Sequence, residues 1–136
     1  MNIVVGLSAS PESEAAVFAA VDEAALRGAG VMLLQANDSR ERGTGRSVTY
    51  AVPESEVTAY ARKRGVSVTA RSIPADAELG EALIDLSYQE DTAMVVLGLQ
   101  RRSPVGKLFL GSTSQRVLLE AGCPVHTVKV RVGPRR

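Results

Sequence analysis

The sequence holds few of the residues that build aromatic cores, disulfides or metal centres. Tryptophan is absent, aromatic residues make up 4% of the chain, and the 136 residues include 1 cysteine and 1 histidine. A lone cysteine excludes an internal disulfide, and together with one histidine it is too little for a Cys/His zinc site. We therefore expect a core of aliphatic side chains and alanine, and a reducing compartment.

The chain also lacks an excess of charge of one sign and a long apolar run. The 16 cationic and 15 acidic residues leave a formal net charge of +1, which argues against nucleic acid or an anionic membrane as the main partner. No apolar run reaches the roughly 18 residues of a membrane span, and "MNIVVGLSASPES" enters a strand pattern without a basic leader. We expect a cytoplasmic protein with no nucleic-acid and no membrane partner.

Strand-like and helix-like segments alternate along the whole chain. Short apolar or alternating runs predict five strands, at "NIVVGL", "GVMLLQAN", "VSVTARSI", "TAMVVLGL" and "CPVHTVKVRV". Amphipathic or alanine-rich stretches predict four helices, at "PESEAAVFAAVDEAALR", "ESEVTAYARKRG", "AELGEALIDLSYQE" and "TSQRVLLEAG". This alternation predicts an α/β fold with a doubly wound five-stranded parallel sheet, whose third and last strands are peripheral.

The length fits one domain, residues 1–136, with two segments outside its core. The polar, glycine-bearing run at 38–47 predicts a mobile loop, and residues 133–136 predict a frayed tail. Ser10 followed by Pro11 predicts the start of the first helix, and Asp76 is a candidate cap for the third.

The stretch "GLQRRSPVGKLFLGSTSQRVL", residues 98–118, follows a strand predicted to be buried. Ligands of open α/β sheets bind beyond the carboxyl ends of such strands. Ser112 with Gln115 three residues later predicts a capping box at a helix start. Amides from Thr113 onward would then carry the positive end of the helix dipole, and Gly111 would let a phosphate approach the backbone.

The cations of this stretch leave two interpretations open. Arg101, Arg102 and Lys107 could add charge-assisted bonds to a bound phosphate, or they could be solvated side chains before an ordinary helix. Generic motifs do not decide between them. A Walker loop would need glycine at 101 and Ser or Thr at 108, where Arg101 and Leu108 stand, and no GxGxxG follows the first strand.

A family resemblance is more specific. The segment "LGLQRRSPVGKLFLGSTSQRVLLEAGCPVHTVK" resembles the carboxyl-terminal third of the universal stress protein family, whose signature is glycine, two residues, glycine, nine residues, then glycine with Ser or Thr. Gly98, Arg101, Gly111 and Ser112 occupy those positions. The "VVGLSASPES" start is also similar, so the resemblance covers nearly the whole chain. It implies an adenine nucleotide alpha hydrolase-like fold with strand order 3-2-1-4-5, and a homodimer paired through the C-terminal strand.

The resemblance also implies a nucleotide site, because part of the family binds ATP with Mg and part is nucleotide-free. The positions that align with the family's nucleotide-binding residues are Leu7, Ser8, Ala36, Gly98, Arg101, Gly111, Ser112, Thr113 and Ser114. Two of them depart from the pattern. Ser8 stands where the ATP-binding members have an aspartate, and Arg101 replaces the second glycine, where it could block the phosphates or replace lost amide contacts.

Residues for catalysis are scarce. His126 is far in sequence from hydrolytic partners, Cys123 reads as a small inert side chain, and no catalytic or metal-binding residue is assigned. The sequence therefore favours a binding module for ATP or a related adenine nucleotide with little turnover rather than an enzyme. The alternatives are a nucleotide-free dimeric stress-response interaction protein and a slow ATP hydrolase or phosphotransferase.

Overall fold

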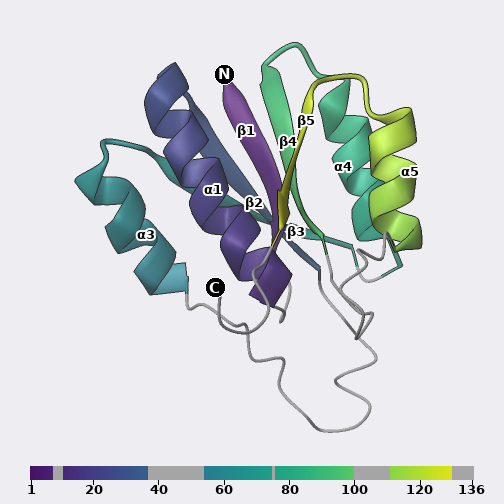
Figure 1. Cartoon of the computed structure of the whole chain (residues 1–136), viewed down its shortest axis with the longest axis horizontal. Coiled ribbons are helices and arrows are strands. Elements are labelled where there is room, and N and C mark those ends of the chain that lie inside the picture. The colour runs from purple at the N-terminus through teal and green to yellow at the C-terminus, as the bar shows by residue number, and fades with distance from the viewer. Residues whose placement is uncertain (8–10, 37–53, 75, 100–110, 130–136) are drawn as a thin grey trace, which may run out of the picture.

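The computed structural model describes residues 1–7, 11–36, 54–74, 76–99 and 111–129. Strands and helices alternate through these residues, as the sequence predicts (Figure 1). The strands are β1 (Asn2–Leu7), β2 (Gly30–Ala36), β3 (Val68–Ile73), β4 (Thr92–Leu99) and β5 (Val125–Lys129). The helices are α1 (Pro11–Arg27), α3 (Glu54–Lys63), α4 (Leu79–Ser87) and α5 (Ser112–Glu120).

All strand pairs of the sheet are parallel. The five strands lie in the order β3-β2-β1-β4-β5, which confirms the predicted topology and places β3 and β5 at the two edges. Parallel strands need crossover connections, and the helices provide them. The order reverses between β1 and β4, so the switch point of the sheet lies at the carboxyl ends of these two strands.

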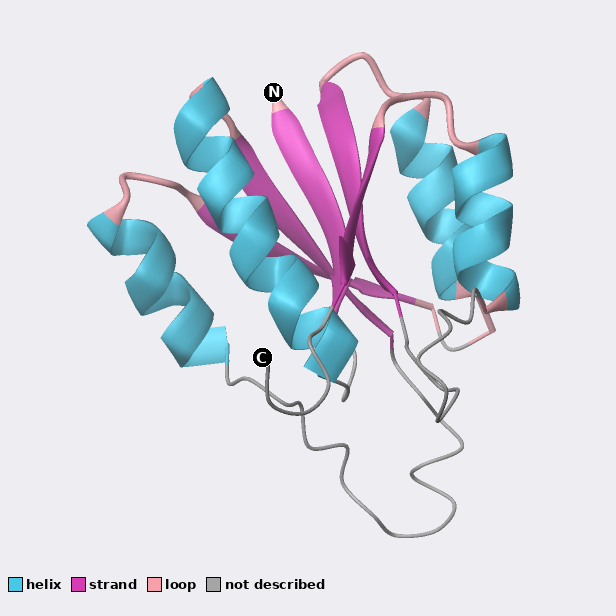
Figure 2. Cartoon of the chain, viewed as in Figure 1, coloured by secondary structure: helices cyan, strands magenta, loops and turns pink. Residues whose placement is uncertain are grey.

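Helices cover both faces of the sheet. Figures 1 and 2 show α1 and α3 on one face, and α4 and α5 on the other. Because strand side chains alternate, β1 contributes to both cores: Ile3 and Val5 pack in the cluster under α1, while Val4 packs in the cluster under α4. These side chains are fully buried, as expected for a strand covered on both faces.

Helix ends follow the sequence signals in some places and not in others. Pro11 is the first residue of α1, and Gly28 and Gly65 follow α1 and α3 with φ of 67° and 70°, the left-handed conformation that glycine adopts at helix C-termini. The predicted cap Ser10, the predicted loop at 38–47 and the predicted tail at 133–136 lie outside the described residues.

Two predicted helix starts were wrong. The N-cap position of α4 is Glu78, whose side chain makes no capping bond, rather than Asp76. Asp76 lies in a preceding turn, where the Ala77 amide donates to the Pro74 carbonyl at 3.0 Å. Helix α5 is capped by Gly111 rather than Ser112.

The capping box proposed for α5 is also wrong. The Gln115 amide donates to the Gly111 carbonyl at 2.9 Å, which is an α-helical bond. Ser112 is therefore already inside the helix, and its hydroxyl is not in the capping position.

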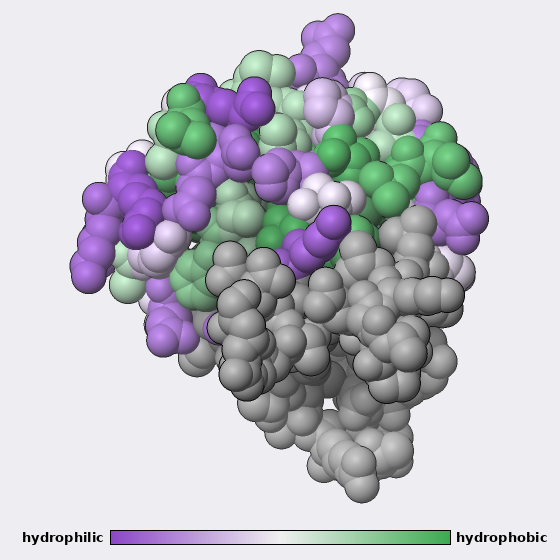
Figure 3. All heavy atoms as spheres, in the orientation of Figure 1, coloured by the Kyte–Doolittle hydropathy of each residue, from purple (hydrophilic) through white to green (hydrophobic). Residues whose placement is uncertain are grey.

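The surface carries both hydrophilic and apolar side chains. Apolar side chains gather on the side of α4 and α5 in Figure 3, and Tyr88, Leu118 and Leu119 are exposed large hydrophobic residues there. No helix within the described part of the chain is both long and apolar enough to cross a membrane.

Candidate functional site

The predicted site residues that the structure describes gather at the carboxyl edge of the sheet. Leu7 and Ala36 are the last residues of β1 and β2, and Gly98 is next to last in β4. Val5 and Val96 pair across β1 and β4, two residues before Leu7 and Gly98. The two strands therefore bring Leu7 and Gly98 to the same level at the switch point.

The end of β1 is held from both faces of the sheet. On one face the buried Ser13 hydroxyl in the first turn of α1 donates to the Gly6 carbonyl at 3.1 Å. On the other face Leu79, the first residue of α4, packs so closely that a Cβ on Gly6 would lie 2.9 Å from its Cδ2. These contacts fix the strand end that leads into Ser8, and both Ser13 and Leu79 were missed from the sequence.

The signals for these two residues were present but not specific. Ser13 is a small hydroxyl residue in a first helical turn, where hydroxyls often bond to nearby backbone. Leu79 was recognisable as apolar and not as a neighbour of Gly6, because that contact joins positions more than 70 residues apart. Glycine at position 6 is the one hint that another element approaches closely.

The first turn of α5 presents backbone amides toward this edge. The N-cap Gly111 is extended, with φ −63° and ψ 161°, and no side chain among the described residues makes the capping bond. Thr113 turns its methyl group toward α4: a Cβ on Gly80 would lie 3.1 Å from Thr113 Cγ2. Thr113 thus offers its amide at this edge while its methyl packs between helices.

Arg116, in the middle of α5, links this helix to the beginning of α4. Its guanidinium lies 2.5 Å from Glu81 and 3.7 Å from Glu78 of the α4 side, and 3.1 Å from Glu120 of its own helix. The hydrogen bonds to Glu120 and then to Glu81 raise the pKa of Arg116 above its ordinary value, which favours the protonated guanidinium. This charged cluster was not foreseen from the sequence.

The two departures from the family pattern, Ser8 and Arg101, lie outside the described residues, as do Arg102 and Lys107. The described part of the predicted site is therefore Leu7, Ala36, Gly98 and the start of α5 from Gly111 to Ser114.

The lone histidine and cysteine lie away from the carboxyl edge. His126 Nδ1 is 3.7 Å from Glu23 of α1, and His126 pairs in register with Val96, two residues before Gly98. Burial raises the pKa of the Cys123 thiol, which lowers its thiolate fraction and agrees with an inert side chain. No group of three or more potential metal ligands occurs among the residues that the structure places.

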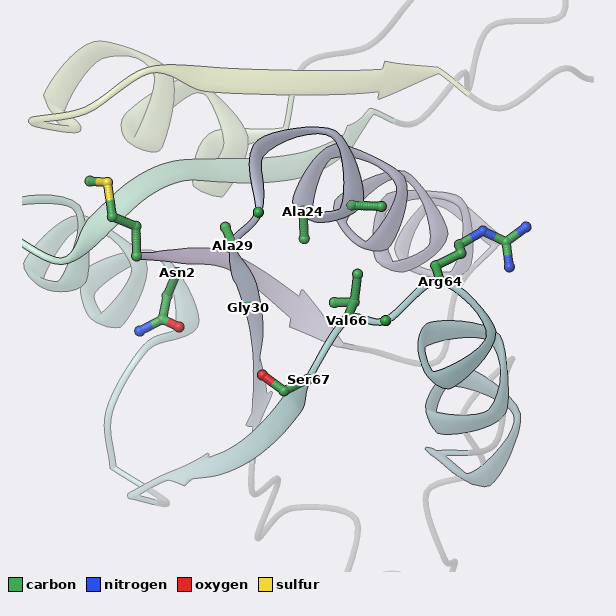
Figure 4. Close-up of a pocket in the computed structure, with 11 residues that line it drawn as sticks. Asn2, Ala24, Ala29, Gly30, Arg64, Val66 and Ser67 are labelled. Carbon is green, nitrogen blue, oxygen red and sulfur yellow. The ribbon is translucent and has the colours of Figure 1, made fainter.

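A pocket of about 440 Å³ lies at the opposite, amino edge of the sheet (Figure 4). Asn2, Gly30 and Ser67 line it where β1, β2 and β3 begin. Arg64 also borders it, but its side chain points away from the pocket in Figure 4 and instead stacks on the Tyr60 ring, 3.4 Å from the ring centre. This pocket therefore has no part in the carboxyl-edge site.

Comparison with known proteins gives a consistent result. The family model described as "Universal stress protein family" matches residues 1–129. A universal stress protein of Mycolicibacterium smegmatis is 35% identical over 133 residues, which covers 93% of this chain and 96% of that protein.

The solved structures agree. A universal stress protein from Archaeoglobus fulgidus is 26% identical with a TM-score of 0.70, over 93% of this chain and 97% of that one. A universal stress protein in complex with cAMP is 22% identical with a TM-score of 0.69, over 95% and 96%. The Archaeoglobus fulgidus protein in complex with dAMP is 24% identical with a TM-score of 0.64, over 93% and 96%.

Proposed function

This chain belongs to the universal stress protein family, and from that premise we propose that it is a binding module for ATP or a related adenine nucleotide with little turnover. The related structures with cAMP and dAMP are complexes with adenine nucleotides, which supports this class of ligand. The proposed binding residues are Leu7, Ser8, Ala36, Gly98, Arg101, Gly111, Ser112, Thr113 and Ser114.

The observation that carries the proposal is the start of α5. The amides of Ser112, Thr113 and Ser114 have no partner within the helix, and no described side chain caps them. They lie at the positive end of the helix dipole, which favours phosphate. Around Gly111 no atom of the described residues comes within 4 Å of the place where a Cβ would stand, which supports room for a phosphate beside the backbone.

We propose that the two ends of the nucleotide bind at different strand ends. The adenosine would lie against the ends of β1 and β2, at Leu7, Ser8 and Ala36, and the phosphates against Gly98 and the α5 start. A bound Mg²⁺ would add charge neutralisation on the phosphates. Little turnover is expected because His126, the strongest candidate base, sits beside Glu23 and away from the strand ends.

A nucleotide-free interaction protein is the second candidate, and a specific observation favours it. Ser8 supplies one hydroxyl where the ATP-binding members have a carboxylate, and Arg101 adds a side chain where they have glycine. Both changes would lower nucleotide affinity. A slow hydrolase or phosphotransferase remains the third.

Nucleotide content and titration separate these functions. We expect denatured, freshly purified protein to release an adenine nucleotide, and the stripped protein to bind ATP with Mg²⁺ with a Kd below about 1 mM. No released nucleotide and no binding at millimolar ATP would establish the nucleotide-free alternative. Steady release of ADP from the bound state would favour the third function.

The substitution Gly111→Ala tests the place of the phosphates. The added methyl meets none of the described residues and stands on an ordinary backbone conformation, so the thermal midpoint should stay within a few degrees. ATP affinity should fall about tenfold or more because the methyl occupies the phosphate's approach. Ser55→Ala, an exposed change in the first turn of α3, is the control and should leave ATP affinity unchanged. Equal ATP affinity in Gly111→Ala would contradict this placement.

We further propose a cytoplasmic homodimer paired through β5. The edge position of β5 supports strand pairing between two copies, because an edge strand offers unpaired backbone groups to a second chain. The single cysteine fits a reducing compartment.

A further inference from the structure

Two acidic residues of α4 lie beside the start of α5. The two helices approach at Gly80 and Thr113, where a Cβ on Gly80 would come within 3.1 Å of the threonine methyl. Glu78 caps α4 and Glu81 lies in its first turn, on either side of Gly80. Their carboxylates reach Arg116, which lies two residues after Ser114 in the helix whose first turn is the proposed phosphate site.

Arg116 is the cation that offsets this acidity. It contacts Glu81 at 2.5 Å, Glu120 at 3.1 Å and Glu78 at 3.7 Å. Among the described residues, one guanidinium against three carboxylates leaves a net charge of two negative units in the cluster. The Arg116 side chain is 39% exposed and committed to these partners, so it acts on a neighbouring anion through the local field rather than by contact.

We propose that Arg116 determines specificity for the number of phosphate charges on the bound nucleotide, because it partly neutralises Glu78 and Glu81 beside the α5 start. This inference rests on the proposed nucleotide function. A repulsion between charges grows with the charge of the ligand, so adenosine is indifferent to the cluster and ATP is the most sensitive. Since all four side chains reach solvent, salt screens the effect.

The experiment measures Kd for adenosine, AMP and ATP without added metal, at about 0.05 M and about 0.5 M salt. Arg116→Gln should weaken ATP about two- to fivefold relative to adenosine at low salt, with AMP in between. Glu81→Gln should strengthen ATP binding relative to adenosine, because it removes one negative charge of the cluster. The quantity compared is the ratio of the Kd for ATP to the Kd for adenosine. Both changes in the ratio should shrink at high salt.

Arg27→Gln is the matched control. Arg27 makes the same kind of exposed ion pair, at 3.4 Å to Glu23, but at the carboxyl end of α1, which adjoins the amino edge of the sheet. The ratio of the Kd for ATP to the Kd for adenosine in this variant should equal that of the wild type. Circular dichroism checks that each variant is folded, and Glu81→Gln still tests the inference if Arg116→Gln is not.

The outcomes are distinguishable. If the wild type binds none of the three ligands, the proposed function and this inference both fail. If it binds them and the ratios do not move in Arg116→Gln and Glu81→Gln, this inference alone is overturned. An equal loss for all three ligands in Arg116→Gln would show a purely structural role and would overturn it as well.

Discussion

Two glycines near α5 show how differently one residue type can be used. At Gly111 a Cβ would meet no described atom within 4 Å, whereas at Gly122 a Cβ would lie 2.5 Å from the Tyr88 ring. That ring cannot simply swing aside, because its hydroxyl donates to the Glu120 carbonyl at 2.9 Å. The Gly122 amide is also held, donating to the Ser87 hydroxyl at 2.8 Å. Gly122 therefore serves packing, whereas no described neighbour gives Gly111 a packing role.

The substitution Gly122→Ala should destabilise the protein by about 1–3 kcal/mol, because the new methyl overlaps the Tyr88 ring. Urea unfolding of the variant and the wild type measures the loss. The Tyr88→Ala background removes the overlapping ring, so Gly122→Ala should cost much less there. An equal loss of unfolding free energy in both backgrounds would show that overlap with the Tyr88 ring is not the cause of the destabilisation.

At the scale of elements, Tyr60 in α3 and Arg64 just after it contact α1 through aromatic, hydrogen-bond and ionic interactions. The Tyr60 hydroxyl donates to Asp22 at 2.8 Å, and its ring meets Phe18 edge-on with centroids 4.7 Å apart. Arg64 lies over the same ring and 3.4 Å from Asp22. The buried apolar face of α3 is short and consists of Val57 and Ala61. The polar and aromatic contacts therefore add to a limited apolar contact between α3 and the rest of the protein.

The substitution Tyr60→Phe keeps the ring and removes the hydrogen bond. Stability should fall by about 0.5–1 kcal/mol, since the bond is at the surface. The hydrogen bond to Asp22, then burial, raises the pKa of Tyr60. A raised pKa means that the folded state favours the protonated phenol, so this stabilisation is complete below the ordinary pKa of about 10 and is lost as pH rises through the raised value.

Urea unfolding from about pH 8 to pH 11 checks this sign. The difference between wild type and Tyr60→Phe should shrink as the pH rises. In a double-mutant cycle with Asp22→Asn the two losses should be less than additive. A difference that grows with pH would contradict the assigned hydrogen bond.

At the scale of the whole molecule, the two edges of the sheet differ. Strand β3 is mostly exposed, whereas every residue of β5 except Lys129 is half-buried although β5 is also an edge. Edge strands offer unpaired backbone groups to a second chain. The proposed homodimer would use the β5 edge, with its flanking apolar side chains.

Light scattering at micromolar concentration should give about twice the chain mass of 14.4 kDa. Thr127→Lys, which places a charge in the middle of β5, should shift the protein toward monomer. Ser72→Lys makes the same change on the exposed edge strand β3 and should leave the dimer intact. A wild-type monomer would refute the strand pairing, and a dimer that survives Thr127→Lys would place the interface elsewhere.

Local sequence determined the elements of this protein. Alternating or continuous valines and leucines predicted the five strands, and Pro11, Gly28 and Gly65 marked helix ends correctly, because backbone preferences act within a few residues. The parallel doubly wound class followed from the alternation, whereas the strand order followed from the family resemblance. At the carboxyl edge, the family resemblance supplied Leu7 and Gly98, and local signals placed the start of α5 within one residue.

Contacts between distant positions were decided by the tertiary structure. Asp76 and Ser112 are residue types that favour the N-cap position, yet the N-cap positions of α4 and α5 are occupied by Glu78 and Gly111. The Leu79 contact with Gly6 and the Arg116 cluster had no specific sequence signal, because each joins residues from separate elements. A cap propensity is a weak local preference of about 1 kcal/mol, and packing between helices and sheet outweighs it.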